Sequence, residues 1–371
     1  MTKVAVVTAF NPSNAGMYSV DLAAIQFLKS LNFKFSLYRA HVYRRRLPVF
    51  IDGTRLKYLK NQKPFEKADV VLYWGDFINN PVYAIEDFRE REFFSGRSTE
   101  KYDALEKWKE LFLLKGFSAK EQKVLSVSNN FQSASSALRD VGNKNHQEIV
   151  ELFNRNFDAI FPRDPESTTE MQNTLNSPVS PRIECGVDAA FLVQDHHVGK
   201  LPLELKPGGY FTYFFGRSQI NNADRILSEV SKATGLKPIC LNKWLSLSFR
   251  GWDKDFSEMT TLIYNSAFLL SDTYHCCVNA LAMRRPVIGL GQSVAEQRGT
   301  LGDYKKKTLF SMFDLSDYYI EQSVEGGDQM SKIVDHAKNY SRDNIIGSYF
   351  DTVARKTEAY RTSLVNELSY S

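Results

Sequence analysis

The sequence lacks the usual marks of a secreted or membrane-spanning protein. Its four cysteines (Cys185, Cys240, Cys276 and Cys277) form neither a CxxC pair nor a disulfide framework, which favours a reduced, cytoplasmic setting. No window approaches the roughly 20 consecutive apolar residues that a membrane helix needs. The N-terminal MTKVAVVTAF is too brief for a signal peptide, so we interpret it as a first strand.

Common ligand-binding fingerprints are also missing. There is no P-loop and no GxGxxG motif. Asp195, His196 and His197 have no further ligand at metal-site spacing, so we predict no metal and no cofactor. The formal charge of +4 is too small to indicate a nucleic-acid partner.

Basic residues nevertheless cluster near the N-terminus. They are Arg39, Arg44, Arg45, Arg46, Arg55, Lys57, Lys60 and Lys63. The cluster is interpreted either as a solvated surface or as a patch that faces an anion. Peripheral association with a membrane surface stays open, and nothing in the sequence sets an oligomeric state.

At 371 residues the chain exceeds the roughly 250–300 residues of a single core, which predicts two domains. Strand patterns at 3–10, 33–39, 68–74, 123–131 and 157–161 alternate with helical ones, which predicts a doubly wound α/β fold. We expect a Rossmann-like domain over 1–175, an interdomain region rich in Pro, Ser and Gly over 176–209, and a second Rossmann-like domain over 210–342. A closing helix over 343–371 is expected to return to the first domain.

The segment SDTYHCCVNALAMRRPVIGLG at 271–291 indicates a strand, a turn, a helix and a second strand. Ser271 and Asp272 are predicted to cap the helix, with Thr273, Tyr274 and His275 in its first turn. The positive end of the helix dipole favours an anion there, so Ser271, Asp272, Thr273 and Tyr274 are predicted to bind an anionic donor. His275 is therefore either an acid that faces a phosphate or a structural residue of the turn.

Other candidates follow the strands of the first domain. Asn14, Gly16 and Tyr18 lie in the loop after the first strand, where glycine allows the backbone to approach a ligand closely. Asp76 comes just after another strand and is either a base or a turn former. Asp21 is a second candidate base.

Several segments resemble the polysaccharide pyruvyl transferase family in their order along the chain. SDTYH and RRPVIGL are similar to the family's His-bearing turn and the strand that follows it. The segments 157–175, 183–193 and 254–272 resemble three further family elements. Together with the NPSNAG loop, the resemblance spans most of the chain, although 80–122 and the tail stay unmatched.

The resemblance implies a GT-B-like pair of α/β domains, the first serving the acceptor and the second the donor. It implies transfer of pyruvate from phosphoenolpyruvate onto a sugar of a cell-surface polysaccharide or its lipid-linked precursor. The product would be a ketal, formed in the cytoplasm or at the inner face of the membrane. His275 would protonate the donor, Asp76 would activate the acceptor, and the acceptor would also meet Asn14, Gly16, Tyr18 and Asp21.

The sequence departs from the family pattern at two positions. Thr273 stands where studied members carry an Arg, and a hydroxyl cannot replace a bidentate guanidinium. Met17 replaces the Asp of a Gly-Asp pair. Another cation is therefore expected to bind the donor, Arg217 first and then Lys243 or Arg250. Two other functions stay open: a GT-B glycosyltransferase with a nucleotide-sugar donor, and a non-catalytic carbohydrate-binding relative.

Overall fold

A computed structural model describes residues 1–11, 13–40, 48–94, 101–118, 122–175, 181–218, 220, 222–248, 251–292, 303–322, 328–340 and 346–369. The chain divides into two compact units. Unit 1 comprises Met1–Phe10, Val20–Ala189 and Ala359–Ser371, and unit 2 comprises Asn11–Ser19 and Ala190–Glu358. The loop Asn11–Ser19 thus groups with unit 2, although the sequence placed it within a contiguous first domain.

Unit 1 is built on an eight-stranded sheet in the order β3-β4-β2-β1-β5-β6-β7-β8. Neighbouring strands run parallel apart from the antiparallel pair β3–β4. The predicted strands correspond to β1, β2, β5, β6 and β7. The bounds are β1 Lys3–Thr8, β2 Lys34–Arg39, β3 Val49–Ile51, β4 Thr54–Tyr58, β5 Val70–Asp76, β6 Lys123–Asn129, β7 Ala159–Pro162 and β8 Arg182–Ile183.

The β3–β4 hairpin at the edge of this sheet was not anticipated from the sequence. Its turn residues Asp52 and Gly53 have φ angles of 47° and 70°. Positive φ at both central residues is the type I′ arrangement, for which Asp-Gly is a preferred pair. Phe50 lies directly across the hairpin from Arg55.

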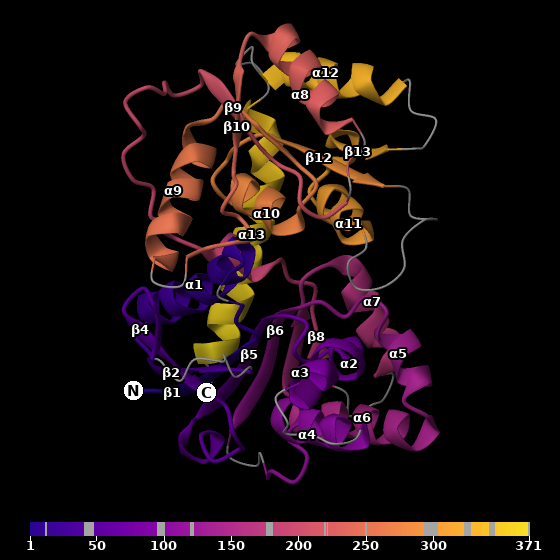
Figure 1. Ribbon diagram of the computed structural model, residues 1–371. Helices are drawn as coiled ribbons and strands as arrows, with labels where there is room; N and C mark the ends of the chain where they lie inside the picture. Colours follow the sequence, from indigo (N-terminus) through magenta and orange to yellow (C-terminus); the bar gives the residue numbers. More distant parts are fainter. Residues whose placement is uncertain are drawn as a thin grey trace. The chain divides into compact units, whose positions relative to one another are not determined.

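The helices of unit 1 fill the connections between its parallel strands, and α3 to α7 gather on one side of the unit (Figure 1). Large aromatic side chains, among them Tyr73, Trp74, Trp108 and Phe112, are fully buried between these helices and the sheet. The bounds are α1 Ala15–Ser30, η1 Phe65–Lys67, α2 Pro81–Tyr83, η2 Ala84–Phe88, α3 Arg89–Phe94, α4 Lys101–Leu113, α5 Ala134–Asp140, α6 Asn143–Asn156 and α7 Pro165–Thr174.

Unit 2 contains a parallel five-stranded sheet in the order β10-β9-β11-β12-β13. The strands are β9 Tyr210–Phe214, β10 Lys237–Cys240, β11 Leu269–Ser271, β12 Val287–Gln292 and β13 Tyr319–Gln322. Because β11 lies between β9 and β12, the loops after these three strands meet at one edge. This edge is where ligands bind in such sheets.

The helices of unit 2 surround its sheet, with α8 and α12 packed together (Figure 1). Inside the unit, the rings of Phe211 and Phe268 stack with centroids 5.1 Å apart. No helix in the described part of the chain is long and apolar enough to cross a membrane. The bounds are η3 Ala189–Leu192, α8 Ala223–Thr234, α9 Trp252–Asn265, α10 Tyr274–Ala282, α11 Tyr304–Met312, η5 Ser316–Tyr318 and α12 Asp328–Tyr340. The last helix, α13 Ile346–Ser369, begins in unit 2 and belongs to unit 1 from Ala359 onward.

Candidate functional site

The turn between β11 and α10 carries the leading candidate, His275. Thr273 is the N-cap residue, with an extended backbone at φ −112° and ψ 121°. The sequence placed the cap one or two residues earlier. The later start follows from Ser271, whose Oγ accepts the Thr273 amide at 3.1 Å and keeps that residue outside the helix. His275 is consequently the second residue of α10, and it is half-buried.

Asp272, predicted to bind the donor, uses its carboxylate within the protein. A carboxylate has about four acceptor positions. All four are occupied, by the amides of Gly216, Arg217 and Ser218 at 2.9, 2.9 and 2.7 Å and by the Thr273 hydroxyl at 2.9 Å. Asp272 therefore holds the loop after β9 against the His275 turn.

Lys306 also connects the loop after β9 with the His275 turn, and its side chain is almost wholly buried. Its Nζ atom donates to Ser218 Oγ at 2.8 Å, to the Asp272 carbonyl at 2.5 Å and to the Leu290 carbonyl at 2.8 Å. It also forms an ion pair with Asp303 Oδ1 at 2.6 Å. Burial alone would raise the pKa of Asp303, but the Lys306 charge and the Asp303 hydrogen bonds outweigh it and lower that pKa.

The loop after β1 packs against the His275 turn within unit 2. A Cβ atom placed on Gly16 would lie 2.3 Å from the Cβ atom of His275, so only glycine fits there. The Gly16 amide donates to Asn14 Oδ1 at 2.9 Å, which shapes the loop. Asn279 Nδ2 then donates to both Ser19 Oγ and the His275 carbonyl, at 2.9 and 2.8 Å. Asn14 and Gly16 therefore shape the surroundings of His275.

Tyr18 links this loop to α9. Its hydroxyl donates to Asp253 Oδ1 at 2.5 Å, and its ring centroid lies 4.6 Å from that of Phe256. The predicted cation Lys243 donates to carboxylates of the same helix, Asp255 at 2.7 Å and Glu258 at 3.0 Å. These two hydrogen bonds raise the pKa of Lys243.

Two of the three predicted donor-binding cations can be placed in the structure. Lys243 is paired with two carboxylates of α9, and Arg250 lies outside the described residues. Arg217 is exposed, and its guanidinium has no partner in the described ranges. Because Asp272 holds its backbone amide, Arg217 is a cation on a loop of defined geometry.

Unit 1 contains the other candidate group, Asp21 and Asp76. Asp76 ends β5 in a left-handed conformation with φ 59°, and its carbonyl accepts the Asn130 amide at 2.5 Å. Asp21 lies on α1 and is fully buried. Burial raises the pKa of Asp21 to about 8, with the Asp76 charge adding to the rise and the Thr8 hydroxyl opposing it. Asp21 thus holds a proton at neutral pH beside Asp76.

Metal and thiol chemistry find little support in the described residues. No group of three or more His, Cys, Asp or Glu within them is arranged to hold a metal ion. Burial lowers the pKa of His196 to about 4, which keeps its ring neutral. Burial also raises the pKa of Cys277 to about 12, so its thiol stays protonated at neutral pH.

A family model now identifies the class of protein. The model of the polysaccharide pyruvyl transferases matches residues 22–293, more than half of the chain and including His275. The chain belongs to the polysaccharide pyruvyl transferase family. This membership places it among the transferases, as predicted. No curated protein sequence matches the chain.

Solved structures resemble this polysaccharide pyruvyl transferase family member in fold. A UDP-GlcNAc 2-epimerase from Methanocaldococcus jannaschii matches with a TM-score of 0.50 and 10% identity, covering 100% of both chains. Apo UGT2 from Phytolacca americana matches with a TM-score of 0.51 and 9% identity, covering 100% of this chain and 99% of its own. These likenesses confirm the predicted GT-B-like fold class and extend no further.

Two segments that carry the family resemblance meet inside unit 1. Arg163, just after β7, is 1% exposed, and its Nη1 lies 3.5 Å from Asp188 Oδ2. Asp188 belongs to the second segment, 183–193, and is 2% exposed. Asp164 caps α7 by accepting the Ser167 amide at 2.7 Å. The family-like segments thus build the carboxyl edge of the unit 1 sheet.

The sequence did not single out three buried charged residues near the carboxyl edges of the two sheets. They are Arg163 in unit 1 and Asp303 and Lys306 in unit 2. Arg163 follows a predicted strand directly, which is a position that could have drawn attention to it. Lys306 stands in the run Tyr304-Lys-Lys-Lys, and such a run is typical of a solvated surface. No pattern distinguishes its buried member from its neighbours.

Proposed function

We propose that the chain transfers a pyruvyl group from phosphoenolpyruvate onto two hydroxyls of a sugar in a cell-surface polysaccharide or its lipid-linked precursor. His275 adds a proton to the C3 methylene carbon of the donor, which leaves a cationic centre at C2. One sugar hydroxyl attacks C2 and gives its proton to a base. The second hydroxyl then replaces phosphate at C2, and the phosphate departs with that hydroxyl's proton. The products are a cyclic ketal and inorganic phosphate.

The position of His275 is the observation that supports this proposal most directly. It is the second residue of α10, inside the family-matched range, where the positive end of the helix favours an anionic donor. A donor phosphate at this position would also stabilise the imidazolium that the first step requires. General acid catalysis of this kind typically contributes ~10²–10⁴-fold to a rate.

For the donor side we assign charge recognition to Arg217. The family's Arg before the His is replaced by Thr273, so the donor carboxylate or phosphate needs another cation. Ser271 and Thr273 already donate to the Phe214 carbonyl at 2.8 Å and to Asp272 at 2.9 Å. We therefore assign these two hydroxyls to the shape of the turn. We assign binding of the donor's charge to Arg217, and the Tyr274 ring lies beside His275.

For the acceptor side we assign the base to Asp76 in unit 1. Asp21 is fully buried and holds a proton at neutral pH, so we assign it to support of Asp76 and not to contact with the acceptor. Asn14, Gly16 and Tyr18 belong to unit 2, so we assign them to support of the His275 region instead.

Product analysis tests the reaction. The protein is incubated with phosphoenolpyruvate and a panel of oligosaccharides in D2O, and inorganic phosphate and ketal are measured. We expect phosphate release that depends on the sugar and one deuterium in the ketal methyl group. Release of UDP or CDP from nucleotide sugars would instead support a glycosyltransferase. Stoichiometric sugar binding without any release would support a non-catalytic role.

Thermal shift tests the donor assignment separately. A ligand at 100 times its Kd stabilises a protein by about 2.7 kcal/mol. We expect phosphoenolpyruvate to raise the Tm of the protein and of Arg225→Ala, an exposed control on α8, but not that of Arg217→Ala. Stabilisation by UDP or CDP alone would contradict phosphoenolpyruvate as the donor.

A further inference from the structure

One short segment has an excess of positive charge equal in size to the net charge of the whole chain. The 14 residues TRLKYLKNQKPFEK, from Thr54 to Lys67, contain five basic residues and one acidic residue. The whole chain has 47 Lys and Arg against 43 Asp and Glu. Without this segment, basic and acidic residues balance at 42 each. The segment is therefore one local source of positive potential.

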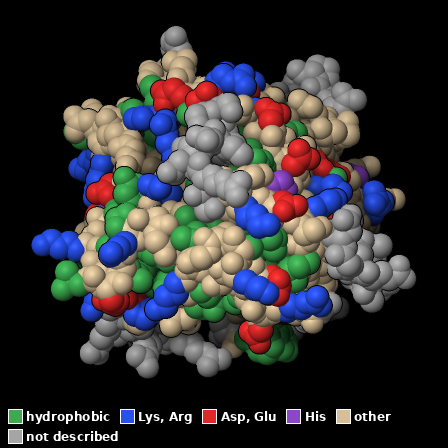
Figure 2. Space-filling view, turned by 90° about the horizontal axis from the view of Figure 1, so that it is seen from above, with side chains coloured by type: hydrophobic (Ala, Val, Ile, Leu, Met, Phe, Trp, Pro, Cys, Tyr) green, Lys and Arg blue, Asp and Glu red, His purple; other side chains and the backbone are tan. Residues whose placement is uncertain are grey.

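The structure exposes all five of these basic side chains on unit 1. Arg55 and Lys57 project from β4, Lys60 and Lys63 from the loop after it, and Lys67 from η1. In the described part of the chain, Lys60, Lys63 and Lys67 have no ion-pair partner. The face in Figure 2 differs, because its Lys and Arg side chains are interspersed with Asp and Glu. We name the five residues the basic segment.

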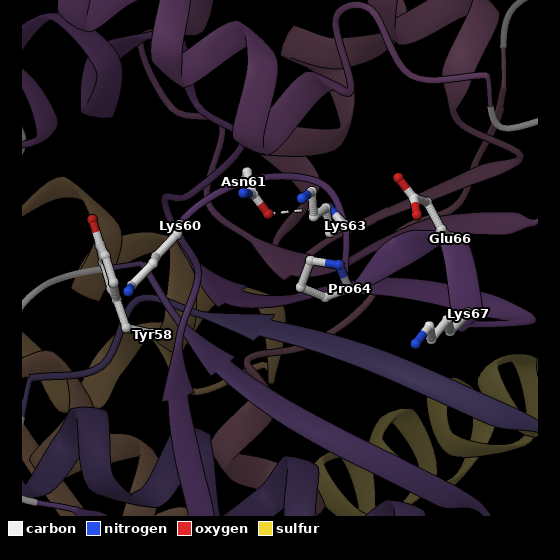
Figure 3. A pocket seen from close by; sticks show the side chains of 7 residues that line it. All are labelled: Tyr58, Lys60, Asn61, Lys63, Pro64, Glu66 and Lys67. Atoms are coloured by element: carbon white, nitrogen blue, oxygen red, sulfur yellow. Dashed lines mark hydrogen bonds between the residues drawn. The ribbon is translucent and has the colours of Figure 1, made fainter.

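A pocket of about 520 Å³ opens along this segment. Figure 3 shows its lining, in which Lys60 extends toward Tyr58 and Glu66 and Lys67 project from η1 in different directions. Three ammonium groups against a single carboxylate make it a pocket for anions. The lysines are spread along the rim and do not converge on one point, which suits an extended anionic surface better than one small ion.

Protection of the sheet edge does not explain this charge. Lysines on an edge strand discourage strand pairing with other chains, and that reason could cover Arg55 and Lys57. It does not cover Lys60, Lys63 and Lys67, which lie in the loop and in η1.

An exposed aromatic residue lies opposite one of the five basic residues. The Phe50 side chain is on the edge strand β3, directly across from Arg55 and so on the same face, and it is 48% exposed. Clusters of four to eight basic residues with an apolar contact are the pattern that binds anionic phospholipid. Polyphosphate, a soluble polyanion without bases, needs the charge but makes no use of the aromatic ring.

We propose that the basic segment and Phe50 form a surface that binds unit 1 to an anionic phospholipid membrane. The binding is electrostatic, with Phe50 as a shallow apolar contact, and it requires no membrane-spanning helix. The proposal does not depend on the transfer reaction, because none of these residues is assigned to donor or acceptor.

Co-sedimentation with vesicles tests this surface. Phosphatidylcholine vesicles are compared with vesicles that also contain phosphatidylglycerol, at low and high salt. We expect binding only to the anionic vesicles, and weaker binding as salt increases. Each basic residue near an anionic leaflet is worth roughly fivefold in affinity. The triple variant Lys60→Gln, Lys63→Gln, Lys67→Gln should therefore bind about a hundredfold more weakly.

The matched control removes the same charge from unit 2. Lys206→Gln, Lys232→Gln, Lys237→Gln changes three exposed lysines, and we expect it to bind like the parent protein. Equal loss in both triple variants, or no binding to anionic vesicles, would overturn the proposal. Phe50→Ser should weaken vesicle binding but leave binding to soluble polyphosphate unchanged. Polyphosphate binding as tight as vesicle binding, with neither affected by Phe50→Ser, would assign the surface to a soluble polyanion instead.

Discussion

Gly16 and His275 touch so closely that the contact leaves no room for a Cβ atom on Gly16. A Cβ atom on Gly16 would lie 2.3 Å from His275 Cβ and 2.8 Å from its Nδ1 atom. The loop after β1 thereby sets the position of the His275 side chain. This contact joins residues that are far apart in the sequence but belong to the same unit.

Gly16→Ala should displace His275 and impair pyruvyl transfer more than it impairs folding. Overpacking of this kind costs about 1–3 kcal/mol of stability. We expect kcat to fall at least tenfold, because a small misplacement of a catalytic group is costly. Gly199→Ala is the control, since its added Cβ would meet neighbours at an ordinary 3.5 Å. Unchanged kcat in Gly16→Ala would contradict the positioning role.

His275→Ala should remove the proposed acid without unfolding the protein. The side chain is half-buried at a helix end, so we expect little change in Tm. Phosphate release from phosphoenolpyruvate should fall by ~10²–10⁴-fold. His146→Ala, on α6 of unit 1, is the control and should retain full activity. A retained rate in His275→Ala, measured at saturating donor, would rule out the acid role.

Lys306→Met should destabilise unit 2 strongly, because it leaves the buried Asp303 carboxylate without its cation. Breaking a buried ion pair on one side typically costs about 3–5 kcal/mol. Denaturant unfolding measures this loss. The KM for the donor should also rise, since Lys306 supports the Arg217 loop through Ser218 and Asp272.

The neighbouring Lys307 supplies the control for that prediction. Lys307 forms a surface ion pair with Glu321 at 3.1 Å, and its side chain is 54% exposed. Surface pairs are worth about 0–1 kcal/mol. Lys307→Met should therefore change stability little, and equal losses in the two variants would contradict the buried network.

Asp21→Asn should change how stability depends on pH. The folded pKa of Asp21 is raised from 3.8 to about 8, so the folded protein binds this proton more tightly than the unfolded chain does. The resulting stabilisation is complete below the unfolded pKa and is lost as pH rises toward the folded one. The loss amounts to about 1.4 kcal/mol per pH unit over that window.

Denaturant unfolding at several pH values measures the effect. Asp21→Asn lacks the titrating group, so its unfolding free energy should fall less steeply with pH than that of the parent between about pH 4 and pH 8. Asp140→Asn, at an exposed carboxylate, should follow the parent. Parallel curves for Asp21→Asn and the parent would show that Asp21 is ionised in the folded protein.

Much of the fold could be predicted because buried parallel strands leave a plain pattern. Runs such as KVAVVT and VVLYWGD correspond to β1 and β5. The helix that carries His275 lies between the turn at Ser271 and Pro286. The β3–β4 hairpin was missed although its Asp52-Gly53 turn is a strong hairpin signal. Its strands of three and five residues are too short to show periodicity.

The candidate site was predictable only in part. His275 and Asp76 follow strands, so the general rule for α/β sheets points to them. The hydrogen bonds that occupy the Asp272 carboxylate were not predictable. Three of their four donors come from a different loop, and one comes from its own turn. The same holds for Lys243, whose partners on α9 follow it by 12 and 15 residues.

The sequence by itself determined the alternation of strands and helices, the family and the turn that carries His275, since these depend on local periodicity and on residue order. Only the tertiary structure decided that Gly16 meets His275 and that Lys306 is the buried lysine among three in a row. Packing brings distant loops together, and the burial that results sets which polar groups must be paired. No local sequence pattern predicts either outcome.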